Sequence, residues 1–412
     1  MHFVKKYAVF ILILCMIAAM LPVDTMFVYA RPDAKEYRLE EENTTETGNQ
    51  SVLDIESPSA LLMELNSGQV LYEKDPDTAR KPASVTKIMT MLLAFEALDS
   101  GKFKLDDMVT VSANAAGMGG SQVYLEEGEQ QSFQDLLKCV IVSSANDAAT
   151  AVGEAIAGSE EGFVALMNER AKELGMEHSH FENACGLEAE GHQMSARDIA
   201  VLSRYLLLNH PEVTEYTTIW MDTIVHKTKR GDSEFGLANT NKFLKKYEGA
   251  NGLKTGYTSV AGFSMSATAT RNGTTLIAVV MGSKTKDIRY SDAAKLLDFG
   301  FANCSIYEDK NVLDGKKQIA VRDGVQDAVF VEKKSPFRYV FVGDKGEGEI
   351  QKRLQIVKDK APIKKGDVVA KVIYSQDGKE LGSMDVVATQ DVEQQKYHHA
   401  LKKIFEQYIN IY

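Results

Sequence analysis

The sequence predicts an α+β domain followed by a small all-β domain. Strand patterns lie at both ends of residues 53–306, and helical apolar spacing fills the region between them. Strands from the two ends are expected to pair in one antiparallel sheet that packs against the helices. Residues 307–390 show short β-rich runs separated by Asp-Gly and Lys-Gly turns, which favours a separate β domain.

The N-terminal residues 1–30 have the features of a signal peptide. Lys5 and Lys6 precede an apolar run at 8–21 that is too short to span a bilayer comfortably. Residues 31–52 are polar and acidic without periodicity, which is typical of a solvated linker. We therefore expect an exported protein whose folded part begins near residue 53.

The composition argues against several classes of function. The 412 residues carry a formal net charge of −11 and no long basic run, so nucleic acid is not an expected partner. Of the four cysteines, Cys15 lies in the predicted signal peptide, and Cys139, Cys185 and Cys304 are far apart in sequence. We expect no disulfide framework, although export would permit one.

The elements of the α+β domain follow in order along the chain. The segment 59–75 reads as two strands around an Asn-Ser-Gly turn, and helical apolar spacing begins at 84–98. Helical spacing continues to about residue 210, and strand patterns return at 220–283. A helix at 291–304 closes the domain. The first hairpin is expected to pair with the late strands.

The C-terminal segment 391–412 has the spacing of an amphipathic helix. Its apolar residues fall on one face: Tyr397, Ala400, Leu401, Ile404, Phe405, Tyr408, Ile409 and Tyr412. Lysines fall on the opposite face. Such a helix either docks on its own domain or lies in a membrane surface, and the lysines opposite an aromatic face favour the membrane. We expect a peripheral membrane anchor.

A serine and a lysine open the helical run "RKPASVTKIMTMLLAFEAL" at 80–98. Ser84 and Lys87 stand three residues apart, so their side chains share one face of a helix. A serine hydroxyl is a weak nucleophile until a base removes its proton, and a lysine is a base only when it is neutral. Apolar surroundings and the positive end of a helix both lower the pKa of a lysine. Ser84 is therefore the candidate nucleophile and Lys87 the candidate general base.

Two further motifs offer groups that such a nucleophile needs. Ser144 and Asn146 in "SSAND" offer a hydroxyl that can relay protons and an amide that can hold a substrate amide. Lys254 and Thr255 in "GLKTGYT" can bind a substrate carboxylate. Gly256 leaves room for a substrate to lie along this strand as an added β-strand.

Two of these motifs have a second copy that we interpret as structural. Ser283 and Lys286 repeat the S-x-x-K spacing, but they follow an apolar strand in a charged turn, so Lys286 is expected to be solvated. Ser112 and Asn114 repeat the S-x-N spacing, and Ser112 is expected to cap a short helix.

The ordered set S-x-x-K, S-x-N and K-T-G is the signature of penicillin-binding proteins and class A β-lactamases. Together with "ALLMELNSGQVLYEKDPDTARKPASVTKIMT", "FENACGLEAEGHQMSARDIA" and "NTNKFL", it makes residues 55–390 resemble the low-molecular-mass penicillin-binding proteins, which are serine-type D-alanyl-D-alanine carboxypeptidases. The resemblance implies a β-lactamase/transpeptidase-like catalytic domain at 53–306. The small β domain and the C-terminal anchor fit the same layout.

The resemblance also implies a reaction. Ser84 would attack the carbonyl between two D-alanines of a peptidoglycan stem peptide, Lys87 would take its proton, and Ser144 would protonate the departing D-alanine. Water would hydrolyse the acyl-enzyme, and β-lactam antibiotics would acylate the same serine. Backbone N–H groups of Ser84 and Tyr257 would form the oxyanion hole. No cofactor or metal is implied, and the enzyme would work at the outer face of the bacterial cytoplasmic membrane.

An arginine downstream of K-T-G is also implied, near the substrate carboxylate. Arg289 is the candidate, and Arg271 is the alternative, although its "TRNGT" context is typical of a hairpin turn. Tyr257 stands where many of these carboxypeptidases have histidine, and Cys185 stands where a small polar residue is familiar. The change at Tyr257 should be tolerated because the implied donor there is backbone.

Three other functions share parts of this pattern. An endopeptidase that cuts peptidoglycan crosslinks would carry the same motifs. A class A β-lactamase would carry an E-x-x-L-N stretch that is absent between Asn146 and Lys254. A catalytically inactive, membrane-bound cell-wall binder would not need all three motifs intact. Metal catalysis is poorly supported, because His178 and His180 lack an H-E-x-x-H pattern.

Overall fold

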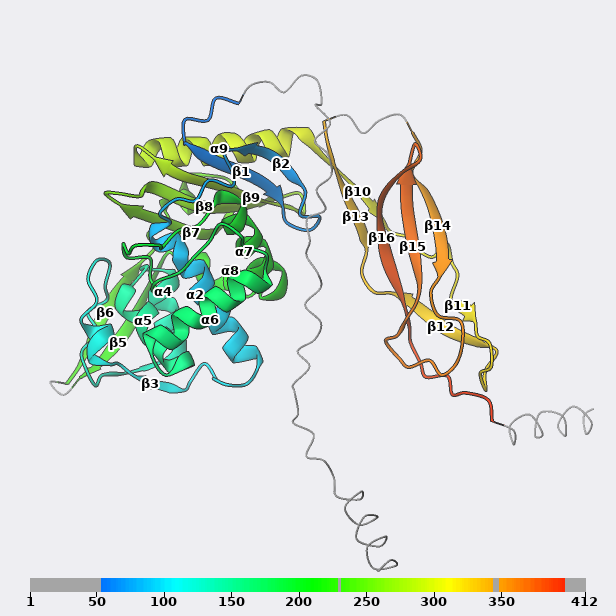
Figure 1. The fold of residues 1–412 in the computed structure, drawn as a ribbon, viewed down its shortest axis with the longest axis horizontal. Helices are drawn as coiled ribbons and strands as arrows, with labels where there is room; N and C mark the ends of the chain where they lie inside the picture. The colour runs from blue at the N-terminus through cyan, green and yellow to red at the C-terminus, as the bar shows by residue number, and fades with distance from the viewer. Residues whose placement is uncertain (1–52, 229–230, 344–347, 397–412) are drawn as a thin grey trace, which may run out of the picture. The chain divides into compact units, whose positions relative to one another are not determined.

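The computed structural model describes residues 53–228, 231–343 and 348–396. The predicted signal peptide at 1–30, the predicted linker at 31–52 and residues 397–412 of the predicted tail helix lie outside the described residues (Figure 1). Across the described ranges, every helix is too short or too polar to traverse a lipid bilayer.

A five-stranded antiparallel sheet forms the centre of the first domain, in the order β2-β1-β9-β8-β7. Its strands are β1 (Ser59–Glu64), β2 (Val70–Lys74), β7 (Ala250–Thr258), β8 (Gly262–Arg271) and β9 (Thr274–Ser283). The predicted pairing of the first hairpin with the late strands is confirmed, because β1 runs antiparallel to β9 over its whole length. Strand β7 lies at one edge of the sheet.

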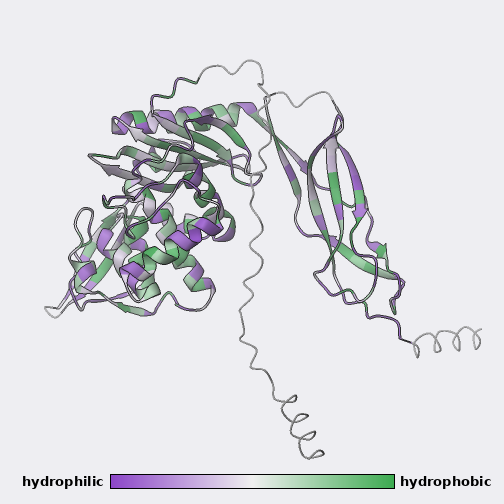
Figure 2. Ribbon diagram, in the orientation of Figure 1, coloured by the Kyte–Doolittle hydropathy of each residue, from purple (hydrophilic) through white to green (hydrophobic). Residues whose placement is uncertain are grey.

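The two faces of the sheet pack against different helices. On β1, Ala60 and Leu62 join the apolar cluster of α9 (Lys286–Asn303), whereas Leu61 and Met63 join the larger cluster of the helical region. The alternation follows from the period of two in a β-strand, and each buried leucine contributes about 2 kcal/mol. Figure 1 shows α9 on one face and helices α2 and α4 to α8 on the opposite face. Figure 2 shows hydrophilic and hydrophobic residues interspersed along α9, as expected for a helix with only one covered face.

The helical region fills the chain between β2 and β7. Its helices are η1 (Ala83–Thr86), α2 (Lys87–Asp99), α3 (Ala113–Ala116), α4 (Phe133–Ile141), α5 (Asn146–Ala157), α6 (Glu160–Glu173), α7 (Ala196–Asn209), α8 (Val213–Thr217) and η2 (Lys242–Lys245). Two small strand pairs join them: β3 (Met108–Thr110) with β4 (Gln130–Ser132), and β5 (Met221–Thr228) with β6 (Gly231–Ala238). Helix α2 is buried on nearly all sides, so it forms the axis of this region.

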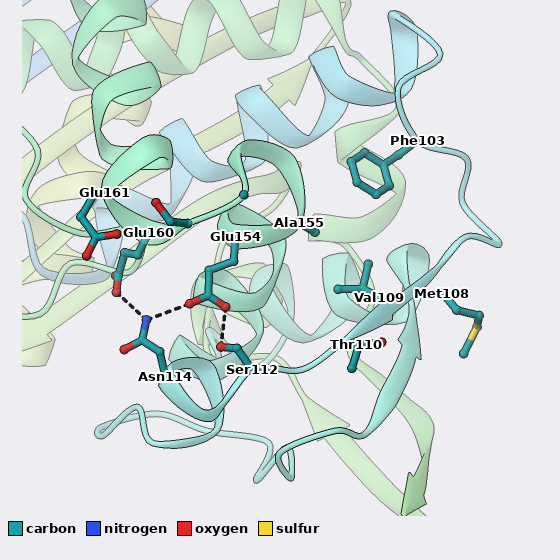
Figure 3. Close-up of a pocket in the computed structure, with 12 residues that line it drawn as sticks. Phe103, Met108, Val109, Thr110, Ser112, Asn114, Glu154, Ala155, Glu160 and Glu161 are labelled. Carbon is teal, nitrogen blue, oxygen red and sulfur yellow. Dashed lines mark hydrogen bonds between the residues drawn. The ribbon is translucent and has the colours of Figure 1, made fainter.

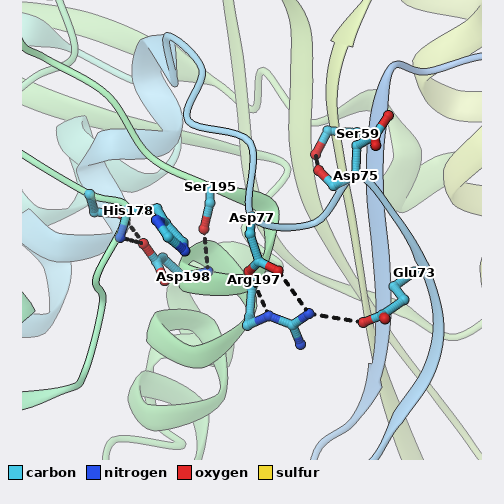
Figure 4. A network of polar contacts seen from close by, with 9 residues as sticks. Ser59, Glu73, Asp75, Asp77, His178, Ser195, Arg197 and Asp198 are labelled. Carbon is cyan, nitrogen blue, oxygen red and sulfur yellow. Dashed lines mark hydrogen bonds and ion pairs between the residues drawn. The ribbon is translucent and has the colours of Figure 1, made fainter. Parts of the chain in front are cut away.

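The end of β2 and the segment that leads from it to η1 are tied to the start of α7 (Figure 4). Arg197 donates from Nε to Asp77 Oδ1 at 2.7 Å and from Nη2 to Glu73 Oε2 at 2.9 Å. Ser195 caps α7, because its Oγ accepts the N–H of Asp198 at 3.1 Å. These contacts hold the chain in place just before it turns into η1.

The second domain is all β, as predicted. Strands β11 (Gln318–Ala320), β12 (Ala328–Lys333), β16 (Lys379–Ala388), β15 (Val368–Gln376) and β14 (Gln351–Ile356) form one sheet in that order, and β10 (Cys304–Asp309) pairs with β13 (Phe337–Val342). Of the predicted tail, 391–396 are described and are extended: buried Val392 bridges to Ile363.

Candidate active site

Ser84 lies in a tight turn between β2 and α2. The sequence predicts one helix from Ser84 onward, but the structure divides it into the 3₁₀ turn η1 and the α-helix that begins at Lys87. The turn is entered through Ala83, whose φ of 50° lies in the left-handed region. Such a conformation costs energy for a residue with a Cβ and is common where a functional side chain must be presented.

Lys87 is completely buried, and its ammonium group contacts three oxygen atoms. Nζ lies 3.1 Å from Ser84 Oγ, 2.6 Å from Asn146 Oδ1 and 2.8 Å from the carbonyl oxygen of Cys185. Burial lowers the pKa of Lys87 to about 8, although interactions with Cys185 and Asp147 act in the opposite direction. A usable fraction of this amine is therefore neutral near physiological pH.

The three contacts of Lys87 define what the neutral amine can do. An ammonium group has three donors, and here each one has an oxygen acceptor. When the proton is lost, two donors can remain on Asn146 and Cys185, and the lone pair then faces Ser84 Oγ. In this state the Ser84 hydroxyl can donate to Nζ, which is the geometry that general-base activation requires.

Ser144 and Asn146 are brought into the same site by the turn between α4 and α5. Ser144 has a φ of 60°, which again lies in the left-handed region, and Asn146 is the first residue of α5. Asn146 Nδ2 donates to the carbonyl oxygen of Gly119 at 2.6 Å, and this contact fixes its Oδ1 toward Lys87. The loop at 117–120 therefore helps to orient the amide.

Lys254 comes from the edge strand β7 and contacts Ser144. Its Nζ donates to Ser144 Oγ at 2.7 Å and to the carbonyl oxygen of Thr255 at 3.1 Å. Burial lowers the pKa of Lys254 well below its usual range, and the positive charges of Lys87 and Arg289 lower it further. The site thus holds two serine–lysine pairs, one at Ser84 and one at Ser144, and the lysine of each pair is buried.

Gly256 allows β7 to approach the turn that carries Ser84. A Cβ at this position would lie 2.7 Å from the carbonyl oxygen of Pro82 and 3.1 Å from the backbone nitrogen of Ser84, so only glycine fits. The next residue, Tyr257, is 55% exposed and stacks on Phe263 with ring centroids 4.2 Å apart. Because β7 is an edge strand, part of its backbone is open to an added peptide.

Arg289 is buried beneath β7 and β8 rather than exposed on the surface. Its Nη1 donates to the carbonyl oxygens of Gly256 at 3.2 Å and Ser264 at 3.4 Å, and its Nε has no hydrogen-bond partner in the described structure. Burial lowers the pKa of its guanidinium. The alternative, Arg271, instead contacts Glu248 and Asp298 near the β8–β9 turn.

Sequence reasoning assigned no role to the loop at 181–192, which contributes to the site. The carbonyl of Cys185 accepts from Lys87, and Asn183 Oδ1 accepts the backbone N–H groups of Cys185 and Gly186 at 3.2 and 2.7 Å. Buried His192 contacts Thr86 Oγ1 through Nε2 at 2.8 Å. The only sequence signal was the run "FENACGLEAEGH", which does not reveal that a backbone carbonyl would bind the lysine.

The second copies of the motifs lie apart from this cluster. Ser112 caps α3 by accepting the N–H of Ala115 at 2.9 Å, as predicted, and Lys286 is exposed. Ser112 and Asn114 line a pocket of about 580 Å³, where both bond to Glu154 (Figure 3). That pocket contains no serine–lysine pair.

The fold and the contact of Ser84 with the buried Lys87 are those of a serine-type hydrolase that forms an acyl-enzyme. Residues 43–285 match the D-alanyl-D-alanine carboxypeptidase family, and residues 301–394 match the penicillin-binding protein 5 C-terminal domain. The chain belongs to the D-alanyl-D-alanine carboxypeptidase family of low-molecular-mass penicillin-binding proteins.

Individual proteins resemble the chain over most of its length. D-alanyl-D-alanine carboxypeptidase DacF of Bacillus subtilis is 38% identical, over 86% of this chain and 90% of that protein. Penicillin binding protein 5 from Haemophilus influenzae superposes with a TM-score of 0.67 at 32% identity, covering 84% of this chain and 99% of that one. Penicillin-binding protein D2 from Listeria monocytogenes in its ampicillin-bound form gives 0.53 at 32% identity, covering 60% and 99%.

Proposed function

We propose that this protein removes the terminal D-alanine from peptidoglycan pentapeptide stems through an acyl-enzyme on Ser84. The observation that carries the proposal is the contact of 3.1 Å between Lys87 Nζ and Ser84 Oγ, together with the complete burial of the lysine. Membership of the carboxypeptidase family supplies the substrate class.

The acylation step begins with proton transfer. Neutral Lys87 takes the proton of Ser84 while Oγ attacks the carbonyl carbon between the two D-alanines. The oxyanion of the tetrahedral intermediate accepts hydrogen bonds from the backbone N–H groups of Ser84 and Tyr257. One such donor lowers the activation free energy of comparable acyl transfers by about 3–4 kcal/mol. The approach of β7 to η1 at Gly256 supports this role, because it brings the two backbone segments together.

Collapse of the intermediate breaks the C–N bond and releases D-alanine. Ser144 delivers the proton to the leaving nitrogen, and Lys254 holds the Ser144 hydroxyl at 2.7 Å and can replace that proton. Lys254 and Thr255 donate hydrogen bonds to the substrate carboxylate along β7, and the buried Arg289 guanidinium supplies positive potential there. Water then attacks the acyl-enzyme and frees Ser84.

β-Lactam antibiotics are proposed to acylate Ser84 by the same first step. The ampicillin-bound Listeria protein shares the fold and supports this expectation. Slow hydrolysis of the β-lactam adduct would leave Ser84 acylated for a long time. A β-lactamase would instead hydrolyse the same adduct rapidly. Intact motifs and two assembled serine–lysine pairs argue against a catalytically inactive binder.

The location proposed for the enzyme is the outer face of the bacterial cytoplasmic membrane. It rests on the signal-peptide features of residues 1–30 and on the amphipathic pattern of 391–412. A protein that lacks residues 397–412 should be released from membranes by gentle washing. If it stays fully membrane-bound, the tail is not the required anchor.

The activity is tested by D-alanine release from a pentapeptide muropeptide, with Ser84→Ala as the matched variant. We expect release by the wild type and none by Ser84→Ala. A crosslinked muropeptide dimer in a parallel reaction separates the endopeptidase alternative, because that enzyme would cut the dimer faster than the pentapeptide. Absence of release from the pentapeptide by the wild type would refute the carboxypeptidase proposal.

A further inference from the structure

Three potential metal ligands converge where α2 ends and α7 meets α8. They are Asp99, the last residue of α2, His210, which follows α7, and Glu212, which precedes α8. One oxygen or nitrogen atom from each lies within 4.8 Å of the others, and among the described residues this is the one such group of three. Along α2, Asp99 stands about 18 Å from Lys87, so the group is separate from the active site.

His210 is buried with one ring nitrogen directed at the two carboxylates. The residue is only 4% exposed, and its Nδ1 lies 3.2 Å from Asp99 Oδ2 and 3.8 Å from Glu212 Oε1. In the described structure this buried Nδ1 forms no hydrogen bond. A buried ring nitrogen usually has a partner, so these distances without a hydrogen bond point to a ligand at this position.

The imidazole ring is fixed in this orientation by its neighbours. Phe95 stacks on His210 with ring centroids 5.8 Å apart and an angle of 26° between the planes. The backbone N–H of His210 donates to the carbonyl oxygen of Leu206 at 2.8 Å, which ends α7. The nitrogen is therefore preorganised and would lose little freedom on binding.

The electrostatics of the cluster favour a cation. Helices α2 and α7 both end here, and neither has a basic residue in its last turn. The negative ends of two helix dipoles therefore add to the charges of Asp99 and Glu212. Among the described residues, His210 is the sole ion-pair partner of either carboxylate.

We propose that Asp99, His210 and Glu212 bind a divalent zinc ion that fastens the end of α2 to the start of α8. One imidazole and two carboxylates suit zinc better than calcium or magnesium, which prefer oxygen ligands alone. Two ligands of a tetrahedral zinc stand about 3.3 Å apart, because each bond is about 2.0–2.1 Å long. The distance of 3.2 Å from His210 Nδ1 to Asp99 Oδ2 matches this value, and the distance of 3.8 Å to Glu212 Oε1 requires a small movement of the Glu212 side chain. Water completes the coordination.

The site is structural rather than catalytic. Zinc would stabilise the C-terminal end of the helix whose first residue is Lys87. Binding should raise the melting temperature without participating in acylation of Ser84, so the test does not depend on the proposed enzyme activity.

The test titrates zinc into the full chain after removal of metals, using a competing chromophoric chelator and thermal unfolding. We expect one equivalent to bind and to raise the melting temperature. Asp99→Asn and His210→Gln should weaken binding at least about tenfold, since even outer contacts of a metal ligand matter that much. His180→Ala is the matched control, because exposed His180 contacts only one carboxylate, Glu182. It should bind zinc like the wild type.

Several outcomes would overturn the zinc proposal. One is the absence of saturable binding up to about 1 mM zinc, where the affinity would be negligible. Others are equal binding by Asp99→Asn and the wild type, loss of binding in His180→Ala, or stabilisation by calcium but not by zinc. If His210→Gln does not fold, Asp99→Asn decides alone, since the Asp99 side chain is 64% exposed and tolerates substitution.

Discussion

Buried charges are treated differently in the two domains. In the small β domain, buried Asp309 accepts hydrogen bonds from Tyr374 at 2.8 Å and from Lys352 at 3.1 Å. The Asp309 carboxylate therefore forms an ion pair with the Lys352 ammonium. In the catalytic domain, the hydrogen bonds of buried Lys87 and Lys254 go only to hydroxyl, amide and carbonyl oxygens. Neither lysine has a carboxylate ion-pair partner among the described residues.

The difference separates a structural charge from a reactive one. Burial alone would raise the pKa of Asp309, but its hydrogen bonds and the Lys352 ammonium together lower it, so the carboxylate stays charged and fixed. Burial lowers the pKa of Lys87 to about 8, and no paired carboxylate restores it. A buried lysine with neutral partners can lose its proton near neutral pH, which a paired lysine cannot.

The largest expected effect comes from removing each lysine in turn. Lys87→Met should reduce acylation by a fluorescent penicillin by about 10²–10⁴-fold, the range for a lost general base. Its stability should change little, because removal of a buried charge offsets the loss of the donor to Asn146 and Cys185. Lys352→Met should leave acylation unchanged and destabilise the chain by about 1–3 kcal/mol. The comparison fails if Lys87→Met acylates normally or if Lys352→Met does not.

His192 is another buried group of the catalytic domain whose pKa is lowered, and its shift affects the stability of the protein in acid. Burial, with the charges of Lys81 and His180, lowers the pKa of His192 from 6.5 to about 4. The unfolded chain therefore binds this proton more readily, so stability falls as the pH drops from about 6.5 to about 4. The full loss is about 3 kcal/mol.

His192→Gln should reduce that acid loss, because glutamine can still contact Thr86 but cannot be protonated. Denaturant unfolding at several pH values between 4 and 7 measures the difference between the two proteins. If the free energy of unfolding falls equally with pH in the wild type and the variant, His192 is not responsible for the loss of stability in acid.

Gly256→Ala tests the approach of β7 to the nucleophile. The added Cβ would meet the backbone at Pro82 and Ser84, so the strand or the turn must shift. We expect a decrease in acylation rate of about 10–100-fold, since a displacement near 1 Å has effects of this size. Gly236→Ala is the control, because nothing lies within 4 Å of its Cβ position. Equal rates for both variants would contradict a tight fit at Gly256.

The smallest expected effect comes from the cluster of Asp309, Lys352 and Tyr374 in the β domain. Tyr374→Phe removes the hydroxyl that donates to Asp309 but keeps the ring stacked on Phe337, with centroids 3.6 Å apart. The expected loss of stability is about 1 kcal/mol, the typical value of one hydrogen bond. Chemical denaturation measures this loss, and acylation should not change. A variant with altered acylation would mean that the β domain influences the active site.

The fold and the residues that meet in the site could be predicted because their signals are local and ordered. Period-two strands gave the sheet, and three motifs in one order indicated which residues come together. The structure places Ser84, Lys87, Ser144, Asn146 and Lys254 in one cluster, while their individual roles stay predictions.

What could not be predicted lies in the backbone. The carbonyl of Cys185 accepts from Lys87, yet any residue type supplies a carbonyl, so no side chain marks it. Ala83 and Ser144 adopt left-handed φ values that their residue types do not favour. The cluster of Asp99, His210 and Glu212 was missed because its ligands come from different helix ends rather than from one motif.

The most direct test of the central claim is the pH dependence of the second-order rate of Ser84 acylation, measured with a fluorescent penicillin. This rate reports the pKa of the free enzyme, and neutral Lys87 is the active form. The rate should rise with pH and reach half its maximum near the pKa of about 8 that burial gives Lys87. A rate that is flat or falls across this range would contradict activation of Ser84 by a buried, neutral lysine.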